Sequence, residues 1–362
     1  MYKKIFFLAF ILTMGAQIIQ AQFRPYSNEF LALGVGARGL AMGNAQTALV
    51  DDVSSAYWNP AGLNDVENLQ VSAMHAEWFA GVGKYDYIGF AKNIRNDRTI
   101  GLSLIRFGVD NIPNTLNLVD GSGNINYENI TTFSASDVGI LLSYAQNLDI
   151  LGGIKVGGNV KIINRKVGDF AKSWGFGLDL GAQYVYKDKF RLGATLRDAT
   201  ATYNTWSFSF TDEEKQILAL TGNTVPVNSV ELTSQQLILG GAYKFFEKNN
   251  FDVQGALDLV TTFGERNNLI RGAVSIDPRI GVEATYNDVV AFRFGFNNFQ
   301  RFSKGNDTDK KSLSVQPNIG LGLKFNIINI DYALTGFGTV ASGVYSHIFS
   351  VKLNFNASDR IN

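Results

Sequence analysis

The sequence predicts an all-β protein: a 14-stranded antiparallel transmembrane β-barrel with an N-terminal plug segment inside its lumen. Three observations lead to this fold class. An apolar export signal opens the 362-residue chain. After Gln22, no stretch approaches the roughly 18 consecutive apolar residues of a membrane-spanning helix. Apolar and polar residues alternate along many segments, and a closed barrel is the only structure besides the helix that satisfies its backbone inside a bilayer.

Composition and charge exclude several other classes of protein. Charged residues form only 18% of the chain, and the 32 basic residues balance the 32 acidic ones. A nucleic-acid partner, which needs a basic surface, is therefore not expected. The chain has no Cys and only two His, His75 and His347, both of which we expect to be structural. Because thiolate sites and His-based sites lack material, we predict no metal, no cofactor and no enzymatic activity.

Residues 1–21 are typical of a secretory signal peptide. Lys3 and Lys4 form its charged start, residues 5–14 its apolar core, and small residues lie near its end. Cleavage after Ala21 leaves Gln22 first. The alternative is an N-terminal membrane anchor, but the apolar stretch is shorter than the ~20 residues that a spanning helix needs.

Residues 22–65 precede the first strand and are rich in glycine. Gly34, Gly36 and Gly39 match the pattern G-x-G-x-x-G, but a dinucleotide-binding site is rejected because no βαβ unit surrounds them. Glycines also let the backbone pack closely in a narrow space, which suits a plug. Asn59-Pro60 predicts an extended residue followed by a sharp turn into the barrel.

Residues 66–356 are predicted to form the barrel, and residues 357–362 a short C-terminal tail. In the clearest strand, 174–184, apolar residues at even positions alternate with Gly, Asp and Gln. Such alternation gives a strand one lipid-facing and one lumen-facing side. Charges of both signs fall on the inward side, where we expect them to pair or to face water rather than to form an ion-selective ring. The predicted strands lie near 68–79, 84–93, 98–107, 137–146, 153–164, 173–186, 189–199, 235–246, 250–262, 277–287, 289–298, 314–325, 327–336 and 344–355.

The connections and the aromatic residues favour the same fold. Short links near 146–152, 187–188, 247–249, 287–288 and 326 alternate with longer links near 108–136, 200–234, 263–276 and 299–313. Short turns and long loops lie at opposite ends of outer-membrane barrels. A soluble β-sandwich, the alternative, does not explain why outward-facing aromatic residues gather beside the short links, as in an interfacial girdle. These residues are Tyr144, Tyr184, Tyr243, Tyr286, Phe325 and Phe355.

The N-terminal segment carries a motif of a known family. Its residues 36–63 resemble the start of the PorV/PorQ family, outer-membrane proteins of the type IX secretion system that are distantly similar to FadL long-chain fatty-acid transporters. The resemblance implies a FadL-like barrel with an N-terminal hatch inside the lumen, in the outer membrane of a Gram-negative bacterium. In this hatch, Asp51 and Asp52 are expected to act as caps or ion-pair partners. The motif residues are Gly36, Ala37, Arg38, Met42, Gly43, Asp51, Asp52, Asn59, Pro60 and Ala61.

The resemblance leaves two functions open, and protein secretion is the first. PorV-like members bind C-terminal sorting domains of exported cargo and cooperate with the type IX translocon, whereas PorQ-like members anchor a surface subunit. For this function we predict that the loop 200–234 binds the partner, because aromatic side chains are favoured contact anchors. The alternative is that they only cover the barrel mouth as a lid. The predicted anchors are Tyr203, Trp206, Phe208 and Phe210.

Transport is the second function, because FadL-like proteins pass hydrophobic molecules through the barrel and past the hatch. It predicts an apolar pocket between hatch and wall, and a strand kink that opens the wall sideways. Gly157-Gly158 or Gly240-Gly241 would permit such a kink. The expected partners are the lipid bilayer and either type IX translocon or cargo sorting domains, or a hydrophobic ligand or lipid. Residues 120–124 alternate oxygen ligands as calcium loops do, but lack the later Gly and Glu, so we predict a turn.

Overall fold

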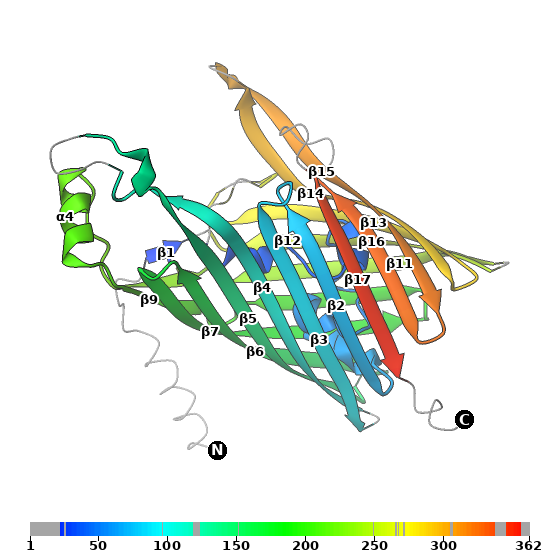
Figure 1. Cartoon of the computed structure of the whole chain (residues 1–362). Helices are drawn as coiled ribbons and strands as arrows, with labels where there is room; N and C mark the ends of the chain where they lie inside the picture. The colour runs from blue at the N-terminus through cyan, green and yellow to red at the C-terminus, as the bar shows by residue number, and fades with distance from the viewer. Residues whose placement is uncertain are drawn as a thin grey trace.

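The computed structural model describes a single closed sheet that surrounds a small folded segment (Figure 1). It describes residues 22–24, 27–95, 97–118, 124–150, 152–248, 250–264, 266, 268–270, 272–304, 307–336 and 345–355. The predicted signal peptide and C-terminal tail lie outside the described residues.

The wall is an antiparallel β-barrel of 14 strands, which confirms the predicted fold class. Each wall strand pairs with its neighbours along the chain, and β17 pairs with β2 to close the ring. One wall strand consists of β8 followed by β9, and the next of β10 followed by β11. The strands are β2 (Leu69–Trp78), β3 (Gly83–Arg95), β4 (Arg98–Asn114), β5 (Thr131–Leu148), β6 (Ile154–Val167), β7 (Ala171–Tyr186), β8 (Phe190–Arg197), β9 (Thr202–Phe208), β10 (Ser229–Thr233), β11 (Gln236–Lys248), β12 (Phe251–Thr262), β13 (Ser275–Tyr286), β14 (Val290–Lys304), β15 (Asp307–Phe325), β16 (Ile328–Thr335) and β17 (Ser346–Phe355).

The outer and inner faces of the wall follow the predicted alternation. On β7, Trp174, Phe176, Leu178 and Leu180 are between 40% and 55% exposed on the outside, whereas Asp179 between them is 5% exposed. On β7, apolar side chains thus lie on the outer surface and polar ones inside, the reverse of a soluble protein. Among the described residues, no helix is both long and apolar enough to cross a membrane.

Three of the predicted long links are partly wrong. The links β5–β6, β7–β8, β11–β12, β13–β14 and β15–β16 meet at one end of the barrel, which we call the turn end. At the opposite loop end, strands continue into the segments predicted as loops 108–136, 200–234 and 299–313, and the hairpin β14–β15 projects well beyond the rim (Figure 1). Alternation weakens in these extensions because lipid no longer requires an apolar outward side.

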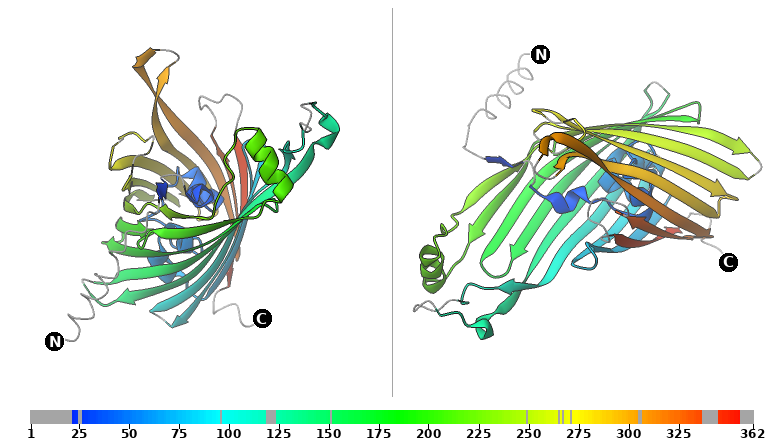
Figure 2. Two further views of the ribbon diagram at one scale, coloured as in Figure 1. Left: turned by 90° about the vertical axis from the view of Figure 1, so that its left-hand side faces the viewer. Right: turned by 90° about the horizontal axis from the view of Figure 1, so that it is seen from above.

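Residues 27–66 fold inside the barrel and form the hatch (Figure 2). The hatch consists of η1 (Glu29–Ala32), α2 (Ala37–Ala41), α3 (Ser55–Trp58) and η2 (Pro60–Asp65). Its apolar side chains, with Trp58 2% exposed, pack against inward-facing residues such as Tyr85 and Ile105 and make the main hydrophobic core. Upstream, β1 (Gln22–Arg24) pairs in parallel with β10 at the loop end.

Close approach of hatch and wall requires glycine at two wall positions. A Cβ atom on Gly181 of β7 would lie 2.1 Å from Asn59 Oδ1. One on Gly295 of β14 would lie 2.2 Å from the backbone nitrogen of Gly43. Since real Cβ atoms do not approach so closely, these glycines let the hatch backbone lie directly on the strands.

The wall is interrupted between β8 and β9. Leu196 pairs with Leu180 of β7, and Tyr203 pairs with Phe176 of β7. Between these two pairs the β8–β9 strand advances by seven residues, whereas β7 advances by only four. The additional residues form a tight turn at Asp198–Ala201, in which Ala201 N donates to Asp198 O (2.8 Å) and both residues have positive φ. The predicted kink sites differ from this position. β6 and β11 run unbroken through Gly157-Gly158 and Gly240-Gly241.

Candidate functional site

Three of the four residues predicted as loop anchors lie on a wall strand instead of in a loop. Tyr203, Trp206 and Phe208 belong to strand β9, and Phe210 follows it, so only residues 209–228 form a loop. Tyr203 is 50% exposed on the outer face, whereas Trp206 on the opposite face is 9% exposed. The structure therefore brings Trp206, Phe208 and Phe210 together and separates Tyr203 from them.

The inward aromatic side chains continue into a longer row. Trp206 stacks on Phe208 (6.1 Å between ring centroids), Phe208 on Phe210 (6.4 Å) and Phe210 on Phe170 (5.7 Å). Phe133 of β5 completes the row with an edge contact to Phe170 (5.0 Å). We call these five residues the aromatic row. Phe170 lies in the link β6–β7, where no strand alternation identifies it in the sequence.

Four members of the aromatic row, all except Phe133, border an open groove of about 980 Å³ at the loop end. Its other walls are the segment that leads into β10, with Pro226 and Val227, and the start of β7. Most side chains that face the groove are apolar, which suits a ligand with little polarity.

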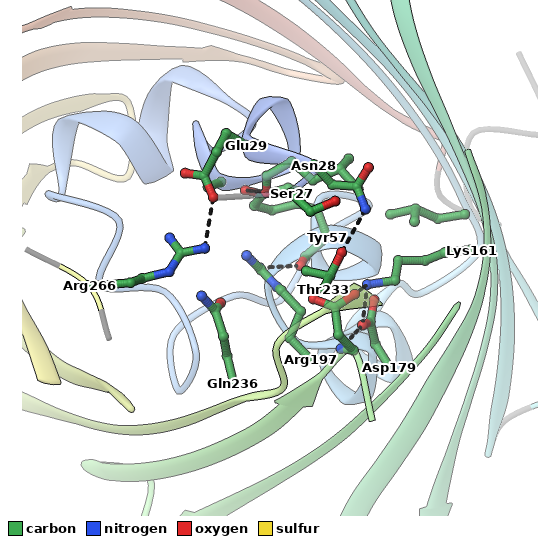
Figure 3. Close-up of a pocket in the computed structure, with 14 residues that line it drawn as sticks. Ser27, Asn28, Glu29, Tyr57, Lys161, Asp179, Arg197, Thr233, Gln236 and Arg266 are labelled. Atoms are coloured by element: carbon green, nitrogen blue, oxygen red, sulfur yellow. Dashed lines mark hydrogen bonds and ion pairs between the residues drawn. The ribbon is translucent and has the colours of Figure 1, made fainter. Parts of the chain in front are cut away.

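Nearer the hatch, a buried cluster of charged groups lies beside the wall interruption (Figure 3). Lys161 Nζ lies 2.8 Å from Asp179 Oδ1 and also contacts Asp198, and the Asp198 backbone nitrogen donates to Asp179 Oδ1 (2.8 Å). Arg197 donates to the Tyr57 carbonyl oxygen (3.1 Å) and lies over the Tyr57 ring. The cluster thus fixes the turn at 198–201 to both the wall and the hatch.

A second charged network attaches the hatch near the turn end. Arg38 donates to Glu283 through Nε (3.0 Å) and Nη2 (2.9 Å), and to Asp51 through Nη1 (3.1 Å). Arg293 of β14 joins Glu283 of the neighbouring β13 (2.5 Å) to Asp331 of β16 (2.6 Å), which lies on the far side of β15. The network borders a polar cavity of about 310 Å³. Inward charges of opposite sign therefore form ion pairs here, one of the two arrangements that the mixed signs of these residues predict.

The hatch itself contributes two strongly perturbed groups. Attraction by Glu283 raises the pKa of Arg38, against the opposing effect of burial, with Asp51 adding to the increase. Burial alone would raise the pKa of Asp52. The Lys352 ammonium (2.6 Å) and the Ser54 hydroxyl nevertheless hold the Asp52 pKa well below its ordinary value. Both side chains therefore remain charged in the folded protein.

Asp52 makes stability depend on pH at the acidic end. Because its pKa is lower in the folded state, its contribution is complete above the unfolded value of about 3.9 and is lost as the pH falls toward the folded value. We expect Asp52→Asn to lower the urea midpoint of unfolding at pH 5, with a smaller difference from wild type at pH 3. A difference that grows at pH 3 would contradict this role.

The Asn-Pro-Ala step fixes the end of the hatch. The Asn59 side-chain oxygen accepts from the Ala61 backbone nitrogen (3.2 Å) and caps η2, which begins at Pro60. Asn59 Nδ2 donates to the carbonyl oxygens of Thr47 (2.8 Å) and Ala182 (3.0 Å), so it joins two hatch segments to β7. Asn59 is extended, as the following proline requires.

The other motif residues surround α2. Gly36 and Gly43 have positive φ (76° and 61°), and they flank the short helix on either side. The Ala37 backbone nitrogen donates to Ser350 Oγ on β17 (3.1 Å), and Met42 is fully buried. The motif therefore builds the hatch and its contacts with the wall, and no motif residue borders the groove.

Comparison with known proteins assigns the chain to a family. A family model described as "Uncharacterised protein family (UPF0164)" matches residues 14–329. The chain belongs to this family. No curated protein matches the sequence of this UPF0164 member.

Solved structures share the fold of the UPF0164 chain. The CymD monoaromatic hydrocarbon channel matches with a TM-score of 0.57 at 12% identity, over 92% of this chain and 99% of that one. The Pseudomonas putida toluene transporter TodX matches with a TM-score of 0.53 at 13% identity, over 89% of this chain and 98% of that one. A Pseudomonas aeruginosa FadL homologue matches with a TM-score of 0.52 at 12% identity, over 89% of this chain and 98% of that one. The fold is therefore that of FadL-type outer-membrane barrels.

CymD is described as a channel and TodX as a transporter, which is consistent with the predicted absence of enzymatic activity. Within the described part of the chain, no group of three or more His, Asp or Glu side chains is arranged to hold a metal ion. The segment 120–124, predicted as a turn, lies outside the described residues except for Asn124.

Proposed function

We propose that this protein is a Gram-negative outer-membrane channel that admits a hydrophobic small molecule. The observation that carries the proposal is the aromatic row, whose stacked rings line an apolar groove at the loop end. Flat rings spaced 5.7 to 6.4 Å apart offer a continuous surface on which an apolar ligand loses its contact with water.

The fold and the comparisons support this proposal. The outer surface of the wall is apolar and suits a bilayer. Structures of the same fold are described as a monoaromatic hydrocarbon channel and a toluene transporter. A function that passes hydrophobic molecules is therefore favoured over secretion, which nothing in these comparisons supports.

The hatch lies in the lumen between the groove and the turn end of the barrel. A ligand that reaches the periplasm must therefore wait for the hatch to move, or leave sideways where the wall is interrupted at 198–201. The buried cluster of Lys161, Asp179 and Asp198 holds this interruption closed. Glycine pairs do not supply the opening, because Gly157 is packed against Pro60 and Gly240 against Thr47.

A second candidate function is partner binding in type IX secretion, as the PorV/PorQ resemblance implies. One observation favours it: large apolar side chains are exposed on the loops around the groove. Leu220 is 80% exposed at the end of α4 (Asp212–Leu220), Val227 is 76% exposed, and Tyr127 of the neighbouring loop is 72% exposed. Exposed apolar side chains of this kind are typical of docking sites.

Removal of two rings from the aromatic row separates the two functions. We expect Phe208→Ala/Phe210→Ala to slow the uptake of naphthalene about tenfold or more, since each lost ring removes about 1 kcal/mol or more of contact. Uptake is measured in a bacterial host that lacks other FadL-type barrels, with heat-modifiable migration as the control for folding. Unchanged uptake, together with co-purification of a translocon subunit or a cargo sorting domain, would contradict transport and support secretion.

A further inference from the structure

The lumen wall beneath the aromatic row is organised in horizontal rungs. On the face that includes the row, Ala135, Val167, Ala171 and Phe208 are paired residues of four neighbouring strands and form an apolar rung. The next rung toward the turn end pairs Asp137, Arg165, Ser173 and Trp206 in the same way. Asp137 and Arg165 therefore place a charged pair one rung below Phe208, in the same rung as Trp206, while Glu231 lines the groove on the side of β10.

Arg165 and Asp137 form a closed pair on this rung. Arg165 Nε donates to Asp137 Oδ1 (2.9 Å) and Nη2 donates to Oδ2 (3.2 Å), the bidentate geometry of a guanidinium on a carboxylate. The guanidinium also lies 5.0 Å from the centroid of the Trp206 ring. It continues the aromatic row as one more flat group. Both side chains remain partly accessible, at 20% and 16% exposure.

The hatch begins directly beyond this rung. The following rung contains Gly139 and Gly175, and a Cβ atom on Gly139 would lie 3.1 Å from Leu31 and 3.5 Å from Phe30 of the hatch. The Asn204 side chain of that rung donates to Ser27 Oγ (3.2 Å). A molecule that moves from the groove toward the hatch along this face must therefore pass Arg165 and Asp137.

The ion pair between Arg165 and Asp137 decides which polar group of a ligand can bind at this rung. A guanidinium without a partner would bind a carboxylate strongly in a partly buried site. Here Asp137 already binds the Arg165 guanidinium through both carboxylate oxygens. An incoming carboxylate is therefore repelled by Asp137 and has to displace it from Arg165. An uncharged flat molecule meets no such cost and stacks on Trp206 and the guanidinium plane.

We propose that the Arg165–Asp137 pair is the specificity determinant of the groove, which selects uncharged aromatic molecules and rejects carboxylates of the same shape. The proposal rests on the function proposed above and deepens it by naming the ligand class. Asp137 sets the charge preference, and Arg165 supplies the stacking surface.

Two ligands of nearly equal shape test this selection: 2-naphthamide, which is neutral, and 2-naphthoate, which is anionic. Their dissociation constants are measured by calorimetry on the full-length protein in detergent. Wild type is expected to bind the amide at least about tenfold more tightly than the carboxylate. Asp137→Asn frees the guanidinium and is expected to reverse this preference, with about a tenfold gain for 2-naphthoate.

Two further variants identify the group responsible. In Asp137→Asn/Arg165→Gln the gain for 2-naphthoate should disappear, because no guanidinium remains to bind it. Asp110→Asn is the matched control, since it opens the Lys84–Asp110 pair elsewhere on the wall (3.3 Å) and should leave the ratio of the two constants unchanged. Heat-modifiable migration verifies that each variant is folded.

The outcomes separate the two proposals. If the wild-type protein binds 2-naphthamide but Asp137→Asn keeps the wild-type preference, the specificity role is overturned and the transport function stands. If wild type binds the two ligands equally, the specificity role is also overturned. If neither ligand binds wild type, the proposed function fails and the specificity role fails with it.

Discussion

Replacement of Lys161 with methionine is expected to cost about 3–5 kcal/mol of stability, because it leaves two buried carboxylates without their cation. Lys161 contacts both Asp179 and Asp198, and all three residues are at most 6% exposed. In the low-polarity interior, the remaining like charges would repel each other and would also lack solvation. The turn at 198–201 and the Tyr57 region of the hatch should loosen together, because Arg197 joins them.

The loss is measured by urea unfolding in lipid vesicles, followed by tryptophan fluorescence. Lys166→Met is the matched control, since the Lys166–Asp169 pair is exposed and its loss should have a much smaller effect. Addition of Asp198→Asn to Lys161→Met should restore part of the stability, because a single carboxylate, Asp179, then remains beside the buried Arg197. A stability loss equal to that of the Lys166 control would show that the cluster does not fix the wall.

Gly295→Val is expected to displace the hatch from β14 and to make the barrel leaky. Its Cβ atom would lie 2.2 Å from Gly43 N and 2.3 Å from the Met42 carbonyl carbon, and backbone atoms cannot rotate away as side-chain ends do. Overpacking of this kind costs about 1–3 kcal/mol, occasionally more. Separation of α2 from β14 and β15 would relieve the clash and open a path along this wall.

Vancomycin susceptibility of cells that produce the variant measures the leak, because this antibiotic is too large and polar to cross an intact outer membrane. Gly241→Val is the control, since a Cβ atom on Gly241 meets no atom within 4 Å. It should leave the cells as resistant as wild type. Equal resistance of the Gly295→Val cells, with the variant protein present and folded, would mean that the wall adapts and the hatch stays in place.

The sequence was sufficient for the barrel wherever lipid constrains one side of a strand. The alternation along 174–184 predicts β7 because each even residue must be apolar and each odd residue must fit the lumen. The same reasoning failed at Trp206 and Phe208. There the strand rises above the apolar belt and its outward residues include Thr205 and Ser207, so the residue pattern resembles that of a loop.

The candidate site was less predictable than the wall for a different reason. The hatch motif is local, and its glycines and Asn59-Pro60 identify a tightly packed segment from sequence alone. The aromatic row instead combines residues from β5, the link β6–β7 and β9, from Phe133 to Phe210, and only the barrel register brings them together. The role of Asp198 is not visible in the sequence for the same reason. Its partner Lys161 lies 37 positions away, and the turn that contains Asp198 interrupts the alternation of apolar and polar residues.

The seam between β2 and β17 has a consequence for biogenesis. Its register pairs Leu69 with Phe355 and Glu77 with His347, so the ring cannot close until nearly the whole chain has been made and aligned. The hatch precedes β2 and touches strands on both halves of the ring. A hatch that folds before the seam forms is enclosed as the sheet curls around it. Contacts so distant in sequence form slowly, and the unsealed sheet needs protection from aggregation meanwhile.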